Sequence, residues 1–487
     1  MFGLTVSEAA AICGGSVFGL NEADAELKRI VIDSREVSVG DLFVAYKGEK
    51  SDGHNFIIPA LKNGAACALA EHLPLITEAD FNSDADPFEM LPGPVIVCSD
   101  VQEAVEKIAA AFRKTLDIPV VGITGSVGKT TTKEMIAAVL GERFQVCKTS
   151  GNLNNTIGLP ISLCSVEPED EVAVMEMGIN HFGEMRRLGK MAAPDIAVFT
   201  IIGHAHLEFL GDLNGVLKAK TEMLESMSED ALVVVNGDDK LLRELKCPQW
   251  KLTFGKSEGC EVRGSNVRST EGFVCCDITY DGKTVHASIP GFGEHLVYAA
   301  LAAAAVGFAV GLSAEEIEAG ISGYKTVGRR LAIEDTGFVR LIDDCYNANP
   351  DSCRSSIDTL SALPGRHVCI FGDMLELGEN SDSMHLEVGK YAAEKGVDLL
   401  LTCGNLAAFM ADAFNSVEKA SSDSKEKGTS PIRFGASAFP NADSLIAALP
   451  QLLRRDDCVL VKASRGVHLE RVSEAIKLLG DRNGRNL

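Results

Sequence analysis

The stretch "IPVVGITGSVGKTTTKEMIAAVLGERF", residues 118–144, predicts a buried strand, a glycine-rich loop and a helix in immediate succession. Gly128, Lys129 and Thr130 match the end of a phosphate-binding loop. In such a loop, backbone N–H groups, the helix N-terminus and the lysine bind phosphate, and the threonine hydroxyl can bind Mg²⁺. The common motif has a further glycine where this chain has Ile123. A chance Gly-Lys-Thr in a turn is the alternative, but the strand–loop–helix order favours a nucleotide site.

The segments after this loop predict a doubly wound α/β domain. "EVAVMEMG" from 171, "PDIAVFTIIG" from 194 and "ALVVVNGDD" from 231 are apolar strand candidates, and helical stretches separate them. This alternation is typical of a parallel sheet with helices on its faces. From Cys260 to Pro290 the pattern changes to short alternating runs around a "YDGK" turn. We therefore expect an antiparallel annex on a parallel sheet.

A small α/β domain is expected before the central one. Its helix at "TVSEAAAI" begins with a capping box formed by Thr5 and Glu8, and "DLFVAYKG" from 41 is a strand candidate. The acidic stretch 77–93 is expected to be a loop because it contains prolines and few apolar residues in register.

A Rossmann-like α/β domain with a second, smaller sheet is expected after residue 328. The strand candidates "VRLIDDCY", "HVCIFGD", "VDLLLTCG" and "DCVLVKASR" alternate with helical stretches. The Ser/Lys/Glu-rich stretch 417–430 is expected to be a solvated loop. The sequence thus predicts three domains, with boundaries at 1–113, 114–327 and 328–487.

Composition limits the possible functions. The chain has 487 residues and a formal net charge of −23, which argues against a nucleic-acid partner. Its 14 cysteines show no Cys-x-x-Cys spacing, as expected for reduced thiols in a cytoplasmic protein. Residues 1–15 lack the features of a signal peptide. The longest apolar run, 296–312, is Ala-rich and is expected to form a buried helix, not a membrane span.

Candidate metal ligands follow the predicted central strands. Glu176 ends the strand candidate at 171, and α/β sheets bind ligands at the carboxyl ends of their strands. His204 and His206 follow the next strand, and alternation would point only one of them at a shared site. Lys218 fits a helix surface, whereas Lys220 matters only if it points at the metal. Structural or solvated roles for the glutamate and the histidines are the alternatives.

Polar and charged side chains also gather at predicted strand ends of the third domain, where they could close over the nucleotide site. These are Arg329, Arg330, Asp343, Asp344, Tyr346, Asn347, Asn349, Lys462, Ser464 and Arg465. Taken alone, each would be an ordinary turn residue.

These motifs, in this order, resemble the Mur ligase family over nearly the whole chain. The matching stretches are "DSR" from 33, "GDLFVA" from 40, "TGSVGKTTT" from 124, "SGNLNNTIGLP" from 150, "EMGINHFGEM" from 176, "AHLEFLG" from 205, "AKTEML" from 219, "DDCYNANP" from 343 and "GDMLELGENSDSMH" from 372. The last two resemble the branch of the family that adds D-alanyl-D-alanine. The Asp-Asn-Pro-Arg motif of the branch that adds the third residue is not found.

The resemblance implies three domains that bind the UDP-muramoyl-tripeptide substrate, ATP and the incoming amine, respectively. It implies ATP-dependent amide formation with Mg²⁺, in which the tripeptide carboxylate becomes an acyl phosphate that D-alanyl-D-alanine attacks. A cytoplasmic monomer without a membrane span is expected. The alternatives are another Mur-type ligase, a folylpolyglutamate-type amide ligase, a regulatory P-loop NTPase or an inactive binding protein.

The resemblance also assigns roles to individual residues. Lys129, His206 and Lys220 are expected to be catalytic. Thr130, Glu176 and His206 match metal positions, and Lys220 matches a lysine that relatives carry as a carbamate. ATP would contact Gly125, Ser126, Val127, Gly128, Lys129, Thr130, Thr131, His295, Arg330 and Asp344. The substrates would contact Ser34, Arg35, Asn154, Asn155, Thr156, Asn180, His181, Tyr346, Asn347 and Asn349.

One departure from the family pattern concerns the base of ATP. The family commonly has His-Asn-x-x-Asn before its Ala-rich helix, and an Asn there helps to hold adenine. This chain keeps His295 but has Leu296 and Ala299 in place of the two asparagines. Either base selectivity is weaker here, or backbone groups replace the missing contact.

Overall fold

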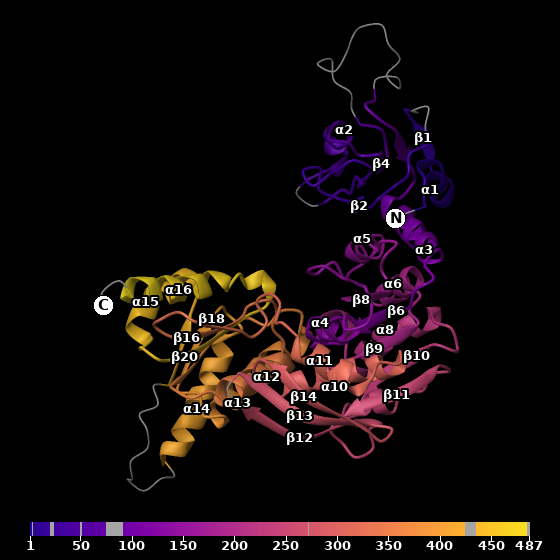
Figure 1. Ribbon diagram of the computed structural model, residues 1–487. Coiled ribbons are helices and arrows are strands. Elements are labelled where there is room, and N and C mark those ends of the chain that lie inside the picture. Colours follow the sequence, from indigo (N-terminus) through magenta and orange to yellow (C-terminus); the bar gives the residue numbers. More distant parts are fainter. Residues whose placement is uncertain are drawn as a thin grey trace.

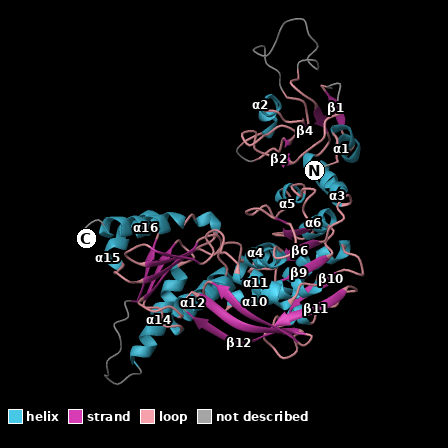
Figure 2. Cartoon of the chain, viewed as in Figure 1, coloured by secondary structure: helices cyan, strands magenta, loops and turns pink. Residues whose placement is uncertain are grey.

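The computed structural model contains three sheets, each formed by a separate stretch of the chain (Figure 1). The structure describes residues 1, 3–19, 24–48, 51–74, 91–270, 272–423 and 435–484. The three-domain α/β architecture expected from the sequence is confirmed. Figure 2 shows helices packed around each of the three groups of strands.

The N-terminal sheet has five strands in the order β1-β5-β4-β3-β2, parallel except for the pair β1–β5. Its strands are β1 (Ser16–Phe18), β2 (Ile30–Val31), β3 (Leu42–Val44), β4 (Cys67–Ala70) and β5 (Val95–Val97). Its helices are α1 (Val6–Cys13), α2 (Ile57–Lys62) and α3 (Val101–Arg113). The predicted capping box of Thr5 and Glu8 is present at the start of α1. Most of the predicted loop at 77–93 lies outside the described residues.

The central sheet has nine strands in the order β14-β13-β12-β11-β10-β9-β6-β8-β7. They are β6 (Val120–Thr124), β7 (Val146–Lys148), β8 (Val172–Glu176), β9 (Ile196–Phe199), β10 (Leu232–Asn236), β11 (Trp250–Gly255), β12 (Val262–Thr270), β13 (Phe273–Tyr280) and β14 (Lys283–Pro290). Neighbours from β7 to β12 are parallel, whereas β12, β13 and β14 are antiparallel. The predicted annex is therefore confirmed, and its turn places Asp281 and Gly282 at positive φ.

Helices cover both faces of the central sheet. They are α4 (Lys129–Leu140), α5 (Gly158–Leu163), α6 (Glu184–Ala192), α7 (Leu207–Leu210), α8 (Leu213–Thr221), α9 (Lys240–Arg243), α10 (His295–Ala309) and α11 (Ala314–Ser322). Apolar side chains of α4, α10 and α11 form one core with the sheet, and those of α3, α5, α6 and α8 form the other. The Ala-rich run is the buried helix α10, as predicted. Among the described residues, no helix is both long and apolar enough to cross a membrane.

The C-terminal sheet has six strands in the order β15-β16-β20-β17-β18-β19, parallel except for the pair β15–β16. The strands are β15 (Ala332–Asp335), β16 (Arg340–Asp344), β17 (His367–Gly372), β18 (Leu399–Cys403), β19 (Gly435–Phe439) and β20 (Cys458–Lys462). The helices are α12 (Pro350–Ser361), α13 (Ser381–Glu394), α14 (Ala408–Asp423), α15 (Ala442–Leu452) and α16 (Glu470–Gly484). Side chains of α12, α13 and α14 pack on one face and those of α15 and α16 on the other.

One loop prediction for this domain is wrong in part. The stretch 417–430 was expected to be a loop, but α14 continues through it as far as Asp423. The segment "VEKASSD" contains no glycine or proline, so its sequence does not interrupt the helix. Residues 424–430 lie outside the described part of the chain.

Candidate active site

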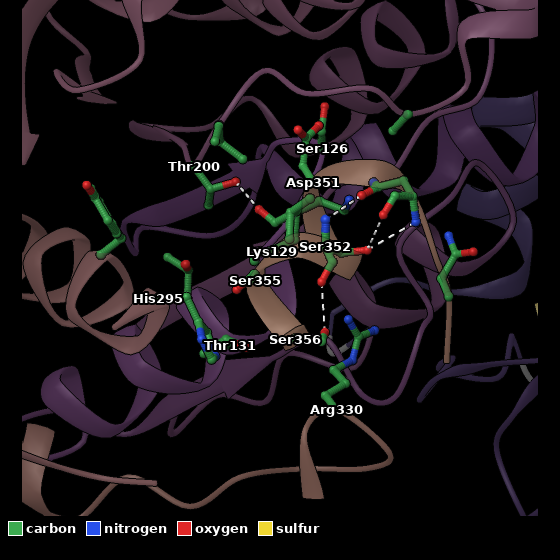
Figure 3. Close-up of a pocket in the computed structure, with 18 of the residues that line it drawn as sticks. Ser126, Lys129, Thr131, Thr200, His295, Arg330, Asp351, Ser352, Ser355 and Ser356 are labelled. Carbon is green, nitrogen blue, oxygen red and sulfur yellow. Dashed lines mark hydrogen bonds between the residues drawn. The ribbon is translucent and has the colours of Figure 1, made fainter. Parts of the chain in front are cut away.

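A large cavity of about 1660 Å³ lies between the central and C-terminal sheets. Residues after β6, β8, β9 and β10 line it from the central side, and residues after β16 and β20 line it from the other. Figure 3 shows Ser126, Lys129 and Thr131 of the phosphate loop in one pocket with Asp351 and other residues of α12. The carboxyl ends of two parallel sheets thus face a common space, where α/β proteins bind ligands.

The phosphate loop has the backbone geometry that its glycines allow. Gly128 precedes α4 with φ 84°, and Gly125 has φ 152°. A Cβ atom on Gly125 would lie 1.9 Å from the hydroxyl oxygen of Thr200, so no side chain fits there. Thr200 donates a hydrogen bond of 2.6 Å to the carbonyl of Val127, which fixes the crest of the loop. The first turn of α4 therefore presents free N–H groups to the cavity.

Lys129 folds back over this loop. Its Nζ donates a hydrogen bond of 2.8 Å to the carbonyl of Gly125. Burial lowers the pKa of Lys129, while the nearby carboxylate of Glu176 acts in the opposite direction. A phosphate group bound by the loop would bring a second negative charge, beside that of Glu176, to this half-buried ammonium group.

Thr130 and Glu176 are brought together, although they come from α4 and the end of β8. The Thr130 hydroxyl donates a hydrogen bond of 2.7 Å to Glu176 Oε2, and Asn154 Nδ2 donates one of 2.7 Å to Oε1. The side chains of Thr130 and Glu176 are both buried. A hydroxyl and a carboxylate oxygen beside a phosphate loop are the hard donors that Mg²⁺ prefers, so these residues fit that ion.

The two histidines of the loop after β9 each contact a carboxylate of the C-terminal domain. His206 Nδ1 lies 2.6 Å from Glu376 Oε2. Asp351 Oδ2 accepts a hydrogen bond of 2.7 Å from the His204 backbone N–H and lies 3.0 Å from His204 Nδ1. The hydrogen bond from His206 holds the pKa of Glu376 below its usual value. Both histidines line the cavity, whereas strand alternation was expected to point only one of them at it.

Lys220 lies in α8 and is 1% exposed. Burial lowers its pKa well below the ordinary lysine value, and the positive charge of Lys129 lowers it further. This environment favours the neutral amine over the ammonium form, and the neutral amine is the form that reacts with CO₂. Lys218, by contrast, is exposed, as its surface interpretation requires.

The C-terminal side of the cavity is organised around Asp344. Its Oδ2 accepts hydrogen bonds of 2.5 Å from Lys462 Nζ and 2.7 Å from the Ser356 hydroxyl. The Arg330 guanidinium lies 4.0 Å from the centre of the Tyr346 ring and lines the same cavity. This geometry gives the site one guanidinium group stacked on an aromatic ring and one buried ion pair.

Two asparagines expected on the dipeptide side line the cavity but already have local partners. Asn349 caps α12, and its Oδ1 accepts a hydrogen bond of 2.8 Å from the Ser352 N–H. Asn347 is exposed, and its Oδ1 accepts a hydrogen bond of 2.9 Å from the Ala348 N–H. Asn347 therefore has its Nδ2 available for a ligand, whereas the side-chain oxygen of Asn349 holds the helix start.

His295 begins α10 and borders the cavity next to Leu296 and Ala299. Its Nδ1 is buried and has no hydrogen-bond partner among the described residues. Burial lowers the pKa of His295 to about 4, with Asp344 acting in the opposite direction. Leu296 and Ala299 are 5% and 3% exposed, so the departure from the family pattern gives this wall of the cavity an apolar surface.

The residues expected to contact the UDP-linked substrate lie in three places. Asn154, Asn155, Thr156 and Asn180 line the cavity. His181 is exposed, and its ring centre lies 4.3 Å from that of Phe209. Ser34 and Arg35 belong to the N-terminal domain and do not line this cavity, and Arg35 pairs with Asp33 at 2.6 Å.

Sequence reasoning missed Glu376 and Asp351 as parts of the site. Glu376 belongs to a stretch that resembles the family and Asp351 follows another directly, but neither residue comes directly after a strand. Their partners are 170 and 147 residues away in the chain, so only the docked arrangement of two domains reveals the contacts.

Family models match the chain in three consecutive parts. They are described as the Mur ligase family, catalytic domain, at residues 26–113, the Mur ligase middle domain at 123–307, and the Mur ligase, glutamate ligase domain, at 328–465.

Named relatives and solved structures agree with these matches. The UDP-N-acetylmuramoyl-tripeptide–D-alanyl-D-alanine ligase of Bacillus subtilis (strain 168) is 33% identical over 479 residues, covering 96% of this chain and 97% of that protein. A crystal structure of MurF from Acinetobacter baumannii superimposes with a TM-score of 0.83 at 28% identity, over 97% and 98% of the two chains. The structure of MurF from Thermotoga maritima in complex with ADP superimposes with a TM-score of 0.77 at 29% identity, over 94% of this chain and 98% of that chain.

Proposed function

The chain belongs to the Mur ligase family, and we infer that it is an ATP-dependent, ADP-forming ligase of peptidoglycan precursor synthesis. It joins D-alanyl-D-alanine to the terminal carboxylate of UDP-N-acetylmuramoyl-tripeptide. The observation that carries this inference is the cavity itself. There, the phosphate loop and the Thr130–Glu176 pair of one domain face polar residues at the strand ends of another. A nucleotide and an amine could therefore meet over a carboxylate held between the domains.

The first chemical step activates the carboxylate. A carboxylate oxygen of the tripeptide attacks the γ-phosphorus of ATP, the bond to the β,γ-bridging oxygen breaks, and ADP leaves. The product is an acyl phosphate, whose phosphate is a good leaving group. Both reactants are anions, so Lys129 and the N–H groups at the start of α4 must offset their repulsion.

The second step forms the amide. The neutral amine of D-alanyl-D-alanine attacks the acyl carbon, and the tetrahedral intermediate expels phosphate and loses a proton. We propose that the amine enters from the C-terminal side, near Tyr346 and Asn347, which line the cavity there. Arg330, stacked on Tyr346, is placed to neutralise nucleotide or departing phosphate.

We propose Mg²⁺ as the metal, held by Thr130, Glu176 and His206. Bound there, Mg²⁺ would supply charge neutralisation for the transferring phosphoryl group. Lys220 would add a carboxylate-like ligand if its neutral amine took up CO₂, because carbamylation converts a cationic side chain into an anionic one. Its burial and lowered pKa support this proposal.

We propose domain boundaries between residues 113 and 114 and between 327 and 328. These positions lie in connections between the three sheets. Because one chain contributes both the phosphate loop and the amine side of the cavity, a monomer suffices for activity. The cytoplasm is the proposed location, since ATP and UDP-linked precursors are found there.

Phosphate release measured with UDP-N-acetylmuramoyl-tripeptide, with and without D-alanyl-D-alanine, tests the proposal. Sustained release should require the dipeptide, and the ligated UDP-pentapeptide should accumulate in equal amount. Glutamate and other single amino acids serve as competing amines. Another Mur-type ligase or a folylpolyglutamate-type ligase would prefer one of them to the dipeptide. Phosphate release independent of any amine would overturn the assignment in favour of a simple NTPase.

A further inference from the structure

The contact between His206 and Glu376 joins the central domain to the C-terminal domain. Glu376 lies in the loop between β17 and α13, and its side chain reaches the histidine expected to bind the metal. The Glu376 main chain takes part as well, because its carbonyl accepts a hydrogen bond of 3.2 Å from the Glu208 N–H. The side chain and the main chain of Glu376 therefore both hold the segment that follows β9.

The loop that carries Glu376 is anchored within its own domain. The buried ring of His385 accepts a hydrogen bond of 3.0 Å from the Met374 N–H. The Ser464 hydroxyl accepts one of 2.9 Å from the Leu375 N–H. Two consecutive residues before Glu376 are thus fixed to α13 and to the end of β20, so the carboxylate is presented from a rigid support.

His206 and Glu376 both adopt a left-handed backbone conformation that residues other than glycine avoid. His206 has φ 56° and Glu376 has φ 62°. Such residues cost of order 1 kcal/mol or more and persist where the surroundings require them, which is common at functional sites. Two residues in this uncommon conformation thus meet across the interface.

A second carboxylate holds the same segment from the same domain. Asp351, at the start of α12, accepts hydrogen bonds from both the backbone and the ring of His204. Residues 204–208 are consequently held from the C-terminal side at two points. The position of this segment depends on the docking of that domain.

We propose that Glu376 is a positioning residue that couples domain docking to the metal site. By accepting the Nδ1 proton of His206, it fixes the imidazole tautomer in which Nε2 carries the free lone pair for a metal ion. A carboxylate behind a metal-binding histidine orients the ring and strengthens it as a ligand. Here the carboxylate comes from another domain, so cation binding and docking stabilise each other. This inference rests on the metal role of His206 proposed above.

Direct measurement of Mn²⁺ binding to the full chain with a non-hydrolysable ATP analogue tests the idea, with free Mn²⁺ followed by electron paramagnetic resonance. Glu376→Ala should weaken one Mn²⁺ site about tenfold or more. Glu376→Gln should retain much of the affinity, because its amide oxygen can still accept the Nδ1 proton. Glu379→Ala removes an exposed carboxylate three residues away and should bind Mn²⁺ as the unaltered chain does.

Small-angle scattering of the same variants reports docking independently of activity. Mn²⁺ and the analogue should reduce the radius of gyration of the unaltered chain more than that of Glu376→Ala. His206→Ala separates the two proposals. If it leaves Mn²⁺ affinity unchanged, the metal role of His206 is wrong. If His206→Ala weakens binding while Glu376→Ala binds normally, the metal role stands and the positioning role of Glu376 is refuted.

Discussion

The Thr130 hydroxyl donates a hydrogen bond of 2.7 Å to the Glu176 carboxylate, so α4 and the end of β8 place two oxygen ligands side by side. Replacing Glu176 with Gln keeps its shape but removes the charge that would bind a divalent cation. We expect kcat/KM to fall on the order of 100-fold, and the Mg²⁺ concentration needed for half-maximal ADP release to rise. Glu171→Gln, an exposed carboxylate at the other end of β8, is the matched control. Unchanged Mg²⁺ dependence in Glu176→Gln would refute the metal role.

The environment of Lys220 predicts a carbamate. The neutral amine would combine with CO₂ and release one proton, and ¹³C-labelled bicarbonate should then give a carbamate resonance in the protein. Lys220→Ala should lose that resonance and most ligase activity, especially at limiting Mg²⁺. Lys218→Ala changes an exposed lysine on the same helix and should keep both. Full activity of Lys220→Ala at limiting Mg²⁺ would exclude the carbamate as a working ligand.

The buried pair of Lys462 and Asp344 predicts a large effect on stability. Lys462→Met leaves the Asp344 charge buried without its partner, which should cost about 3–5 kcal/mol in the unfolding transition of the C-terminal sheet. Adding Asp344→Asn should recover part of that loss, because no unpaired charge then remains. Lys477→Met, which breaks the exposed pair with Glu334, should cost no more than about 1 kcal/mol. Equal effects of the two lysine changes in urea denaturation would contradict this interpretation.

The sequence predicted the central parallel strands well because β6, β8 and β10 are short apolar runs, each ending at a polar residue. Glu176 could be placed at a strand end, and the hairpin turn at Asp281 could be located, from these local patterns alone. Contacts between domains could not be predicted in this way. No sequence pattern near Glu376 indicates that its partner is His206. An asparagine that caps a helix, as Asn349 does, cannot be distinguished by sequence from one that contacts a ligand.

His295 predicts a change in stability with pH. Its pKa is about 4 in the folded chain and about 6.5 when exposed, so between these values the unfolded chain binds a proton that the native chain does not. Stability that is present above pH 6.5 is therefore lost as the pH falls toward 4, by about 2 kcal/mol at pH 5. His295→Gln should reduce the loss between pH 7 and pH 5 by that amount in urea denaturation. The same change at the exposed His286 is the control, and equal pH dependence in all three proteins would refute the argument.

The apolar wall formed by Leu296 and Ala299 predicts weak discrimination between purine bases. No side-chain amide is present at either position to recognise the amino group of adenine, so GTP should replace ATP with a modest loss in kcat/KM. Ala299→Asn restores an amide on the cavity side of α10 and should raise the ATP-to-GTP ratio of kcat/KM about tenfold, as one hydrogen bond allows.

Ala309→Asn, at the exposed end of α10, tests whether the substitution acts merely through the helix, and it should leave the ratio unchanged. The neutral His295 next to this wall keeps a buried Nδ1 that could still contact the base. If the unaltered chain already rejects GTP by a large factor, that nitrogen or the backbone must supply the recognition. In that case a changed ratio in His295→Gln assigns the recognition to that nitrogen, and an unchanged ratio assigns it to the backbone.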